Sequence, residues 1–443
     1  MNEKLTPRQL TLIGSMLLGL FFGAGNLIFP LILGAKAGQN LPAALLGLLM
    51  TAVGIPLLGV MSIGLARSEG LLDLSGRVSP RFRLLFTCAL YLTIGPLFAI
   101  PRCAATSFTI GLSPFVGENP WLWQLGFSLC FFGAVLFFSL KPSKILDSVG
   151  KFLNPAFLLF LGIMLVTALI KPVQSVSSVA PSGDYIHSAF SAGFLQGYDT
   201  LDALASLAFG IIVIRTVRQL GVTEPGRVAV STVNSGVVSM SLMALIYAAT
   251  ALVGAQSFGL YAERLSDPGF TGGYAFAIIA RHYFGPGGAL LLAVTVTLCC
   301  MKTAVGLVTS CGETFEEMFP GRLSYPKWAV LFSGASLLIS NFGLSKIIEF
   351  SAPVLYFLYP LAIVLILLGL LGQFFGHARP VYQWTMWFTL AAAVLELCRV
   401  VRFKPVASLA GRVLPFYTYG LGWVIPAALG FAVGMILNRR HRT

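Results

Sequence analysis

Long apolar runs follow one another along almost the whole chain, and they constrain its fold more than any other feature. A membrane-spanning helix needs roughly 20 predominantly apolar residues. Twelve segments approach or exceed this length: 10–34, 42–66, 84–112, 121–140, 148–170, 190–214, 228–254, 286–312, 328–345, 347–372, 381–398 and 418–438. The pattern predicts an all-α polytopic membrane protein of about 12 transmembrane helices, with 1–443 forming a single transmembrane domain.

The balance of apolar and charged residues supports this prediction. Hydrophobic residues make up 57% of the chain and charged residues 10%, whereas a soluble domain has about a quarter of its residues charged. The net charge of +13 would indicate nucleic-acid binding on a soluble protein. Here most of the Lys and Arg residues lie between the apolar runs, so membrane topology accounts for them. We therefore expect the lipid bilayer, and no nucleic acid, as a partner.

The Lys and Arg residues also orient the predicted bundle. With the N-terminus placed inside, the segments expected inside carry roughly twice as many Lys and Arg residues as those expected outside. This bias predicts that both termini are cytoplasmic. The loop 399–417 is the exception, because it carries four basic residues on the expected outer side. If one late span is misplaced, it is near this loop.

The stretch FFGAGNLIFP, residues 21–30, predicts a break in the first span. Backbone at membrane depth leaves a helix only where protein or a water-filled cavity satisfies its polar groups. Glycine allows a ligand to approach the main chain, and the freed amides of Gly23, Ala24 and Gly25 would suit an anion. Such discontinuous helices form the substrate site of many secondary transporters. The alternative is close helix packing by small residues, but the intramembrane amide of Asn26 favours a site.

The stretch FLQGYDTLDALA, residues 194–205, is the candidate for a second break, at the start of the sixth span. It contains several polar side chains, among them two carboxylates. A carboxylate at membrane depth is energetically costly and usually has a function. We take Gly197, Tyr198, Asp199 and Thr200 as further substrate-binding candidates and Asp202 as a gating or ion-pair candidate. The alternative is that these carboxylates lie at the solvated outer interface.

The positions of the two breaks suggest an inverted repeat. We expect a first five-helix repeat in 1–170, a second in 190–372, and two additional helices in 381–438. This division rests on position, because the two halves show little sequence similarity.

Arg102 follows Pro96 and Pro101 in the third span. An arginine within a membrane span is energetically costly and usually has a functional role. Arg102 is a candidate gate residue that pairs with Asp202 or Asp199, or else a structural ion pair. Lys302 lies deep in the eighth span and is a third candidate of this kind.

Several functional classes find little support in the sequence. All four histidines lie in loops, and neither an HExxH motif nor a nucleophile with a partner histidine is present. We therefore expect no enzyme activity, no catalytic residues and no cofactor. A channel or scaffold is a second rival, but a continuous polar pore lining is not evident. Saturable, stereospecific uptake would distinguish a transporter from both.

Five blocks of this sequence, in order along the chain, resemble bacterial branched-chain amino acid carriers of the BrnQ type. The blocks are LFFGAGNLIFP, YLTIGPLFAIPRCAATSF, GYDTLDALASLAFGIIV, KTAVGLVTSCGETF and SNFGLSKIIEFSAPVLYFLYP. The resemblance covers essentially the whole chain. It implies a cation-coupled symporter for leucine, isoleucine and valine in the bacterial cytoplasmic (inner) membrane, with a LeuT-like 5+5 inverted-repeat fold and broken helices 1 and 6. It indicates no obligatory protein partner.

The segment GLFFGAGN is similar to the first-span break of sodium-coupled amino acid symporters, which reads G-x-x-x-G-x-G-N. The resemblance implies that the N–H groups of Ala24 and Gly25 hold the substrate carboxylate. One Na⁺ would face the Phe21 carbonyl and the Asn26 side chain.

A second Na⁺ would face the carbonyls of Gly19 and Phe22 together with hydroxyls of the eighth span. Thr303 is the first choice for that hydroxyl, and Thr309 or Ser310 is the second. The alternative for these hydroxyls is a hydrogen bond to the helix carbonyl four residues earlier.

Two charged residues leave the coupling ion open. The ammonium of Lys302 could take the place of Na⁺, which would make transport proton-coupled or uncoupled, or it could pair with Glu313 or Asp202. Asp199 could pair with the substrate ammonium or serve a cation. Tyr198 is expected to cap an apolar pocket formed partly by the third and tenth spans. A LeuT-fold transporter for another neutral amino acid is the remaining alternative.

Overall fold

The computed structural model describes residues 5–66, 68, 70–113, 116, 120–140, 144–267 and 269–440, and every regular element in them is helical. The α-helices are α1 (Pro7–Phe21), α2 (Ala24–Ala37), α3 (Leu41–Leu49), α4 (Ile55–Leu65), α5 (Leu71–Gly76), α6 (Pro80–Leu92), α7 (Ala99–Gly111), α8 (Pro120–Leu140), α9 (Lys144–Ile170), α10 (Ala189–Gln196), α11 (Asp202–Gln219), α12 (Pro225–Gln256), α13 (Gly272–Met318), α14 (Tyr325–Ser340), α15 (Leu344–Leu371), α16 (Arg379–Val400), α17 (Lys404–Val413) and α18 (Val424–Arg440).

Short π or 3₁₀ turns interrupt or join these helices. They are η1 (Gly38–Asn40), η2 (Met50–Gly54), η3 (Thr93–Leu97), η5 (Val176–Ser178), η6 (Gly183–Tyr185), η7 (Gly197–Thr200), η8 (Phe258–Leu260), η9 (Ala262–Arg264), η10 (Gly372–Phe375) and η11 (Tyr417–Tyr419). Each of the twelve predicted spans overlaps at least one α-helix. Within the described part of the chain, six helical stretches are long and apolar enough to cross a membrane, and the bent pair α10–α11 makes a seventh. The full count of twelve stays a prediction.

The first predicted span is two helices, α1 and α2, which separate at Phe22 and Gly23. Gly23 is extended, with φ −131° and ψ −161°, so the helix cannot continue through it. The Gly23 N–H donates to the Asn26 side-chain oxygen at 2.7 Å. Asn26 therefore satisfies one of the amides that the break releases at the start of α2.

The sixth predicted span is also two helices, α10 and α11, which meet at an angle of 47°. The turn η7 lies between them, and Leu201 follows it in the left-handed region at φ 67°. A left-handed leucine is strained, and such strain persists only where the surrounding structure imposes it. The side chain of Leu201 is buried, which supplies that packing.

Two further spans are bent. Between α6 and α7 the backbone leaves helical geometry at Gly95, next to Pro96. The helix α13 is bent at Gly285, which precedes Pro286 and has φ 63°. The eighth span was expected to begin at 286, after an irregular interruption, whereas residues 272–284 are helical. A Gly-Pro pair signals a bend, but it does not show that a helix precedes the bend.

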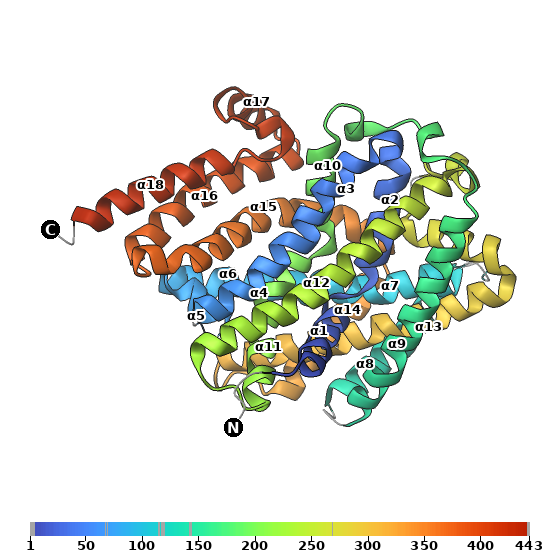
Figure 1. The fold of residues 1–443 in the computed structure, drawn as a ribbon, viewed down its shortest axis with the longest axis horizontal. Helices are drawn as coiled ribbons and strands as arrows, with labels where there is room; N and C mark the ends of the chain where they lie inside the picture. Colours follow the sequence, from blue (N-terminus) through green and yellow to red (C-terminus); the bar gives the residue numbers. More distant parts are fainter. Residues whose placement is uncertain are drawn as a thin grey trace.

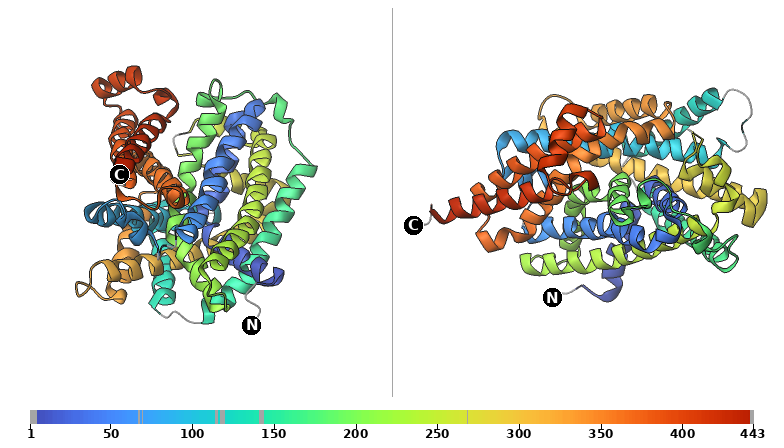
Figure 2. Two further views of the ribbon diagram at one scale, coloured as in Figure 1. Left: turned by 60° about the vertical axis from the view of Figure 1, so that its left-hand side comes forward. Right: turned by 90° about the horizontal axis from the view of Figure 1, so that it is seen from above.

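Figure 1 shows the helices as one bundle, with α16 and α18 side by side at its edge next to α15. Both views of Figure 2 again show these two helices next to each other. Within the bundle α2 packs against α12 and α13, while α11 packs against α4. The two broken spans therefore lie among other helices, where irregular backbone is tolerated.

The basic loop that departed from the charge bias contains the amphipathic helix α17. Arg399, the first basic residue of the range 399–417, lies at the end of α16. It donates to the buried carboxylate of Glu396 at 2.9 Å and lies over the Tyr356 and Tyr417 rings. This arginine thus has a local structural partner. The ends of the chain, 1–4 and 441–443, lie outside the described residues, and the cytoplasmic termini stay a prediction.

Candidate functional site

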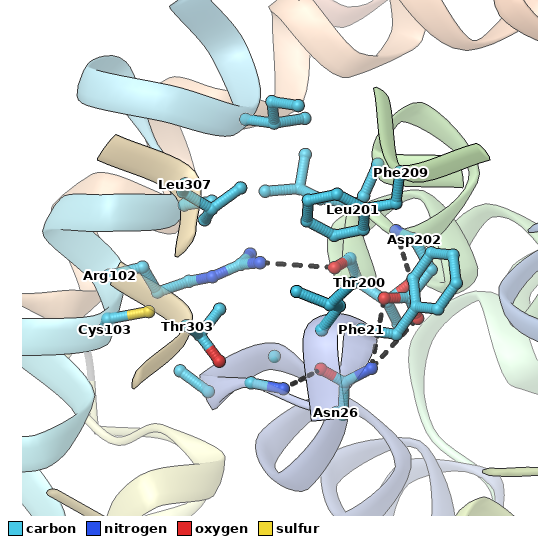
Figure 3. A pocket seen from close by; sticks show the side chains of 17 residues that line it. Phe21, Asn26, Arg102, Cys103, Thr200, Leu201, Asp202, Phe209, Thr303 and Leu307 are labelled. Carbon is cyan, nitrogen blue, oxygen red and sulfur yellow. Dashed lines mark hydrogen bonds between the residues drawn. The ribbon is translucent and has the colours of Figure 1, made fainter. Parts of the chain in front are cut away.

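A small buried cavity lies where the two helix breaks meet. Figure 3 shows it between the first break, with Phe21 and Asn26, and the second, with Thr200, Leu201 and Asp202. The volume that water could occupy in this cavity is about 40 Å³, which is enough for a few water molecules. An amino acid can enter only if the walls of the cavity separate.

The walls of the cavity are mostly apolar. Among the described residues, those that line it are Leu20, Phe21, Gly23, Ala24, Gly25, Asn26, Ile94, Ala99, Arg102, Cys103, Thr200, Leu201, Asp202, Ala205, Phe209, Thr303 and Leu307. The third span contributes, as expected. The tenth span contributes none of these residues, whereas Leu307 of the eighth and Phe209 of the sixth do.

Asn26, Asp202 and Tyr247 form a buried polar network that joins α2, α11 and α12. The Asn26 amide donates to both Asp202 carboxylate oxygens, at 3.2 and 3.0 Å, and to the Tyr247 hydroxyl. Tyr247 donates to Asp202 at 2.6 Å. Each of the three side chains is at most 2% exposed. The network holds a carboxylate at the beginning of α11, where the helix dipole stabilises negative charge.

Arg102 extends from α7 into the same cavity (Figure 3). It donates to the Asp199 carbonyl at 2.6 Å and lies 3.5 Å from the Thr200 carbonyl. Its guanidinium carbon is 5.1 Å from the centre of the Phe29 ring. We expected Arg102 to pair with a carboxylate, but these contacts are to main-chain carbonyls at the end of η7, where a cation is favoured.

Thr303 lies beside the first break. Its hydroxyl is 3.3 Å from the Phe22 carbonyl and equally far from the Cys299 carbonyl of its own helix. The hydrogen bond to the carbonyl four residues earlier is therefore present, and the Phe22 carbonyl, which is a second proposed cation ligand, is equally near. A hydroxyl and a main-chain carbonyl at this distance are ligands of the kind that a hard cation prefers.

Three other proposed cation ligands, Gly19, Thr309 and Ser310, do not line the cavity. The Thr309 hydroxyl contacts the Tyr325 hydroxyl at 3.3 Å, and the Ser310 carbonyl accepts from Thr314. Gly19 lies within α1, before the break, and is not a lining residue. Lys302 is half-buried on α13 and is also not a lining residue.

The structure separates the candidates of the second break. Thr200 and Asp202 line the cavity, whereas Asp199 accepts from Gln196 at 2.7 Å and lines a second cavity of about 310 Å³ together with Phe29 and Lys36. The carboxylate that faces the first break is thus Asp202 and not Asp199.

Tyr198 and Gly197 do not line the cavity. The Tyr198 ring is stacked on Tyr359 at 4.1 Å between ring centres and does not line the cavity, although we expected it to cap the pocket. A Cβ on Gly197 would lie 2.7 Å from the Thr51 Cβ, so glycine allows η7 to approach the second span.

Four helix ends surround the cavity with partial charges of both signs. The carbonyl ends of α1 and η7 present partial negative charge, and the amide ends of α2 and α11 present partial positive charge. The charged side chains Arg102 and Asp202 complement two of these ends. A cavity of this kind matches a small molecule that carries both charges.

The sequence predicted neither Tyr247 nor Phe209 as part of the site. Tyr247 is a polar residue in the middle of the seventh span, and that is a usable signal. Phe209 lies on α11 seven residues after Asp202, close to two helical turns, so it shares a helix face with a predicted residue.

Two broken helices that enclose a mostly apolar cavity with a few polar and charged side chains, within a membrane bundle, define the class of LeuT-fold transporters. The chain has a TM-score of 0.61 to Mhp1, a nucleobase-cation-symport-1 family transporter, over 98% of this chain and 93% of Mhp1, at 15% identity. For MhsT in complex with L-phenylalanine the TM-score is 0.57, with 98% of each chain covered at 14% identity. These similarities show the fold.

Within this class the chain belongs to the family described as "Branched-chain amino acid transport protein", whose model matches residues 6–441. It is 49% identical to the branched-chain amino acid permease BrnQ of Lactobacillus delbrueckii subsp. lactis, over 99% of this chain and all of that protein. It is 35% identical to BrnQ of Escherichia coli strain K12, over 99% and 98% of the two chains. The resemblance seen in the sequence is confirmed, and the protein is a multi-pass membrane transporter rather than an enzyme.

Proposed function

We propose that this protein imports leucine, isoleucine and valine by symport with a cation, and that the substrate binds in the cavity between the two helix breaks. The observation that carries the proposal is the placement of charge in an otherwise apolar cavity. Main-chain amides of α2 lie at one end, and the Asp202 carboxylate lies at the second break. An amino acid needs such polar groups for its backbone and apolar walls for a branched side chain.

In this account the freed amides of Ala24 and Gly25 receive the substrate carboxylate, as they do anions at helix N-termini generally. The ammonium faces the carbonyl end of α1 and the carboxylate of Asp202. Phe209, Leu307 and Ile94 supply an apolar surface for the side chain. Pocket shape distinguishes one methylene by only about 1–3 kcal/mol, so overlapping acceptance of the three substrates is expected.

We propose Na⁺ as the coupling ion, bound between the Phe22 carbonyl and Thr303. The 3.3 Å contact between these groups supports this position. A Na⁺ at Asn26 and Phe21 would require more rearrangement, because the Asn26 oxygen already accepts from Gly23 and its nitrogen donates to Asp202. A membrane potential adds about 2.3 kcal/mol per charge per 100 mV to the driving force.

Alternating access would follow from rocking of one bundle against the other around this site. We assign 1–170 and 190–372 to the two repeats and 381–438 to two additional helices. We place the protein in the bacterial inner membrane because its relatives are bacterial membrane transporters, and we place both termini in the cytoplasm on the basis of the Lys and Arg distribution.

The test is uptake of labelled leucine into proteoliposomes under an imposed sodium gradient or an imposed proton gradient, with unlabelled valine and alanine as competitors. We expect accumulation driven by inward Na⁺ and blocked by valine more strongly than by alanine.

Each other outcome has a defined meaning. Accumulation driven only by protons would overturn the sodium assignment and favour the proton-coupled alternative. Stronger competition by alanine than by valine would favour another neutral amino acid as the substrate. The absence of saturable leucine uptake under either gradient would overturn the proposed substrate.

A further inference from the structure

We propose that the guanidinium of Arg102 binds the carboxylate of the transported amino acid and thereby selects α-amino acids over uncharged analogues. This inference rests on the proposed function and identifies the side chain that recognises the carboxylate of the substrate. Arg102 is a buried charge of the third span, and it lies beside the main-chain amides of the first break, which by themselves favour an anion.

Arg102 is a buried charge that forms no ion pair within the described part of the chain. It is 4% exposed. Among the described residues the ion pairs join Arg227 to Glu224, Lys346 to Glu349 and Arg399 to Glu396, and none includes Arg102. A charged group at membrane depth is costly unless an opposite charge accompanies it. A ligand carboxylate in the cavity would supply the close opposite charge that no ion pair provides to Arg102.

The nearest carboxylate in the cavity is already engaged. Asp202 accepts from Tyr247 and from Asn26, and both partners come from helices other than α7. Figure 3 shows Arg102 approaching from one side of Thr200 and Asp202 lying on the other. The two charges thus face the cavity from different walls, as the two charged ends of a zwitterion require.

The guanidinium lies against the expected carboxylate position. A Cβ on Gly25 would be 2.9 Å from the Arg102 Nη2 atom and 3.3 Å from the Phe29 ring. Gly25 is in the first turn of α2, whose free amides favour an anion. A carboxylate at these amides would therefore be within reach of the guanidinium, and the planar fork of arginine suits two carboxylate oxygens.

The contacts of Arg102 leave donors for such a ligand. A guanidinium has five N–H donors, and the Asp199 and Thr200 carbonyls engage two of its nitrogens. The longer of these contacts, at 3.5 Å to Thr200, is weak and easily exchanged. Binding of the substrate would add a carboxylate to the guanidinium while the shorter contact to the sixth span persists, which couples the substrate to both breaks.

A purely structural role is the alternative, because Arg102 also caps the carbonyl end of η7. The two roles differ in what they predict for a ligand without a carboxylate. The experiment measures equilibrium binding of leucine and of leucine amide to the purified full-length protein. Leucine amide keeps the side chain and the ammonium but lacks the negative charge. The variants are Arg102→Gln, Arg102→Lys and, as a matched control outside the cavity, Arg399→Lys.

We expect the wild-type protein to bind leucine more tightly than leucine amide. Loss of a charged hydrogen-bonding partner should lower this preference roughly ten- to a hundredfold in R102Q. R102K, which keeps the charge but loses the fork, should be intermediate. R399K should keep the wild-type preference. Size-exclusion profiles in detergent establish that each variant is folded.

Three results would overturn the inference. The first is an unchanged preference in R102Q, and the second is equal binding of both ligands by the wild type. The third is a folded R102Q protein that binds neither ligand, which would assign Arg102 to structure alone. Wild-type protein that binds neither ligand would instead contradict the proposed function, and the inference with it.

Discussion

The two helix breaks solve the same problem with different chemistry. The first break uses neutral groups: an extended glycine, free main-chain amides and the amide side chain of Asn26. The second break uses a left-handed leucine held by packing, and charged side chains lie at its two ends. Asp202 lies at the amide end and Arg102 at the carbonyl end.

This difference suggests a division of roles between the breaks. Neutral main-chain groups at the first break leave room for close approach of a ligand, because glycine adds no side chain. Charged groups at the second break set the electrostatic character of the cavity. We therefore expect cavity-lining substitutions at the first break to act mainly through steric clashes, and those at the second mainly through charge.

The largest effect is expected for Asp202→Asn. The amide removes the negative charge that faces the substrate ammonium and places a second donor opposite Asn26 and Tyr247. We expect kcat/KM for leucine uptake to fall at least tenfold. Initial rates in proteoliposomes, normalised to reconstituted protein, measure this. Asp199→Asn should have a smaller effect, because the Asp199 carboxylate lines the second cavity, beside Lys36, and not the cavity between the two breaks. A larger effect of D199N would move the site toward that cavity.

Gly25→Ala is expected to raise KM for leucine roughly tenfold. The added methyl would lie 2.9 Å from Arg102 and 3.3 Å from Phe29, and overpacking of this kind costs about 1–3 kcal/mol. Concentration dependence of uptake provides the measurement. Gly126→Ala in α8 is the control, because its Cβ meets nothing within 4 Å. An unchanged KM in G25A would remove the first break from the binding surface.

Gly197→Ala is expected to change stability and not affinity. Its Cβ would lie 2.7 Å from the Thr51 Cβ in a packed contact outside the cavity. The loss should be about 1–3 kcal/mol, seen as a fall of a few degrees in the thermal unfolding temperature of the purified protein. Gly162→Ala, with open space around its Cβ, should unfold like the wild type. A raised KM at normal stability would instead make Gly197 part of the site.

The smallest effect is expected for Thr303→Ala. Removal of one neutral hydroxyl near the Phe22 carbonyl should raise the Na⁺ concentration for half-maximal uptake several-fold. Sodium titration of leucine uptake measures it, and Thr303→Ser should restore the wild-type value. Thr309→Ala should have no such effect, because Thr309 contacts Tyr325. If T309A shifts the titration and T303A does not, the cation lies further along α13.

Elements and breaks were readable from the sequence because they depend on local composition. Apolar length indicates helices, and glycine beside an amide in GAGN indicates where a helix stops. The family resemblance also led to Thr303, whose partner lies in the first span. The helices and their breaks needed only the order and spacing of residues along the chain, whereas Thr303 needed the resemblance.

The long-range contacts were less accessible. Asn26 and Asp202 are 176 positions apart, and Tyr247 joins them from a third helix. Spacing alone does not tell which face of η7 turns toward the cavity, and so Tyr198 was expected there although it is stacked on Tyr359. The partner of Arg102 was unforeseen for a related reason, since main-chain carbonyls become acceptors only where a helix actually ends.

The most direct test of the account is an experimental structure of the full-length protein with leucine and Na⁺. We expect leucine between Ala24–Asn26 and Thr200–Asp202, with its side chain against Phe209. Leucine bound instead in the second cavity, beside Asp199 and Lys36, would contradict this placement, provided that side chains fill the cavity between the two breaks.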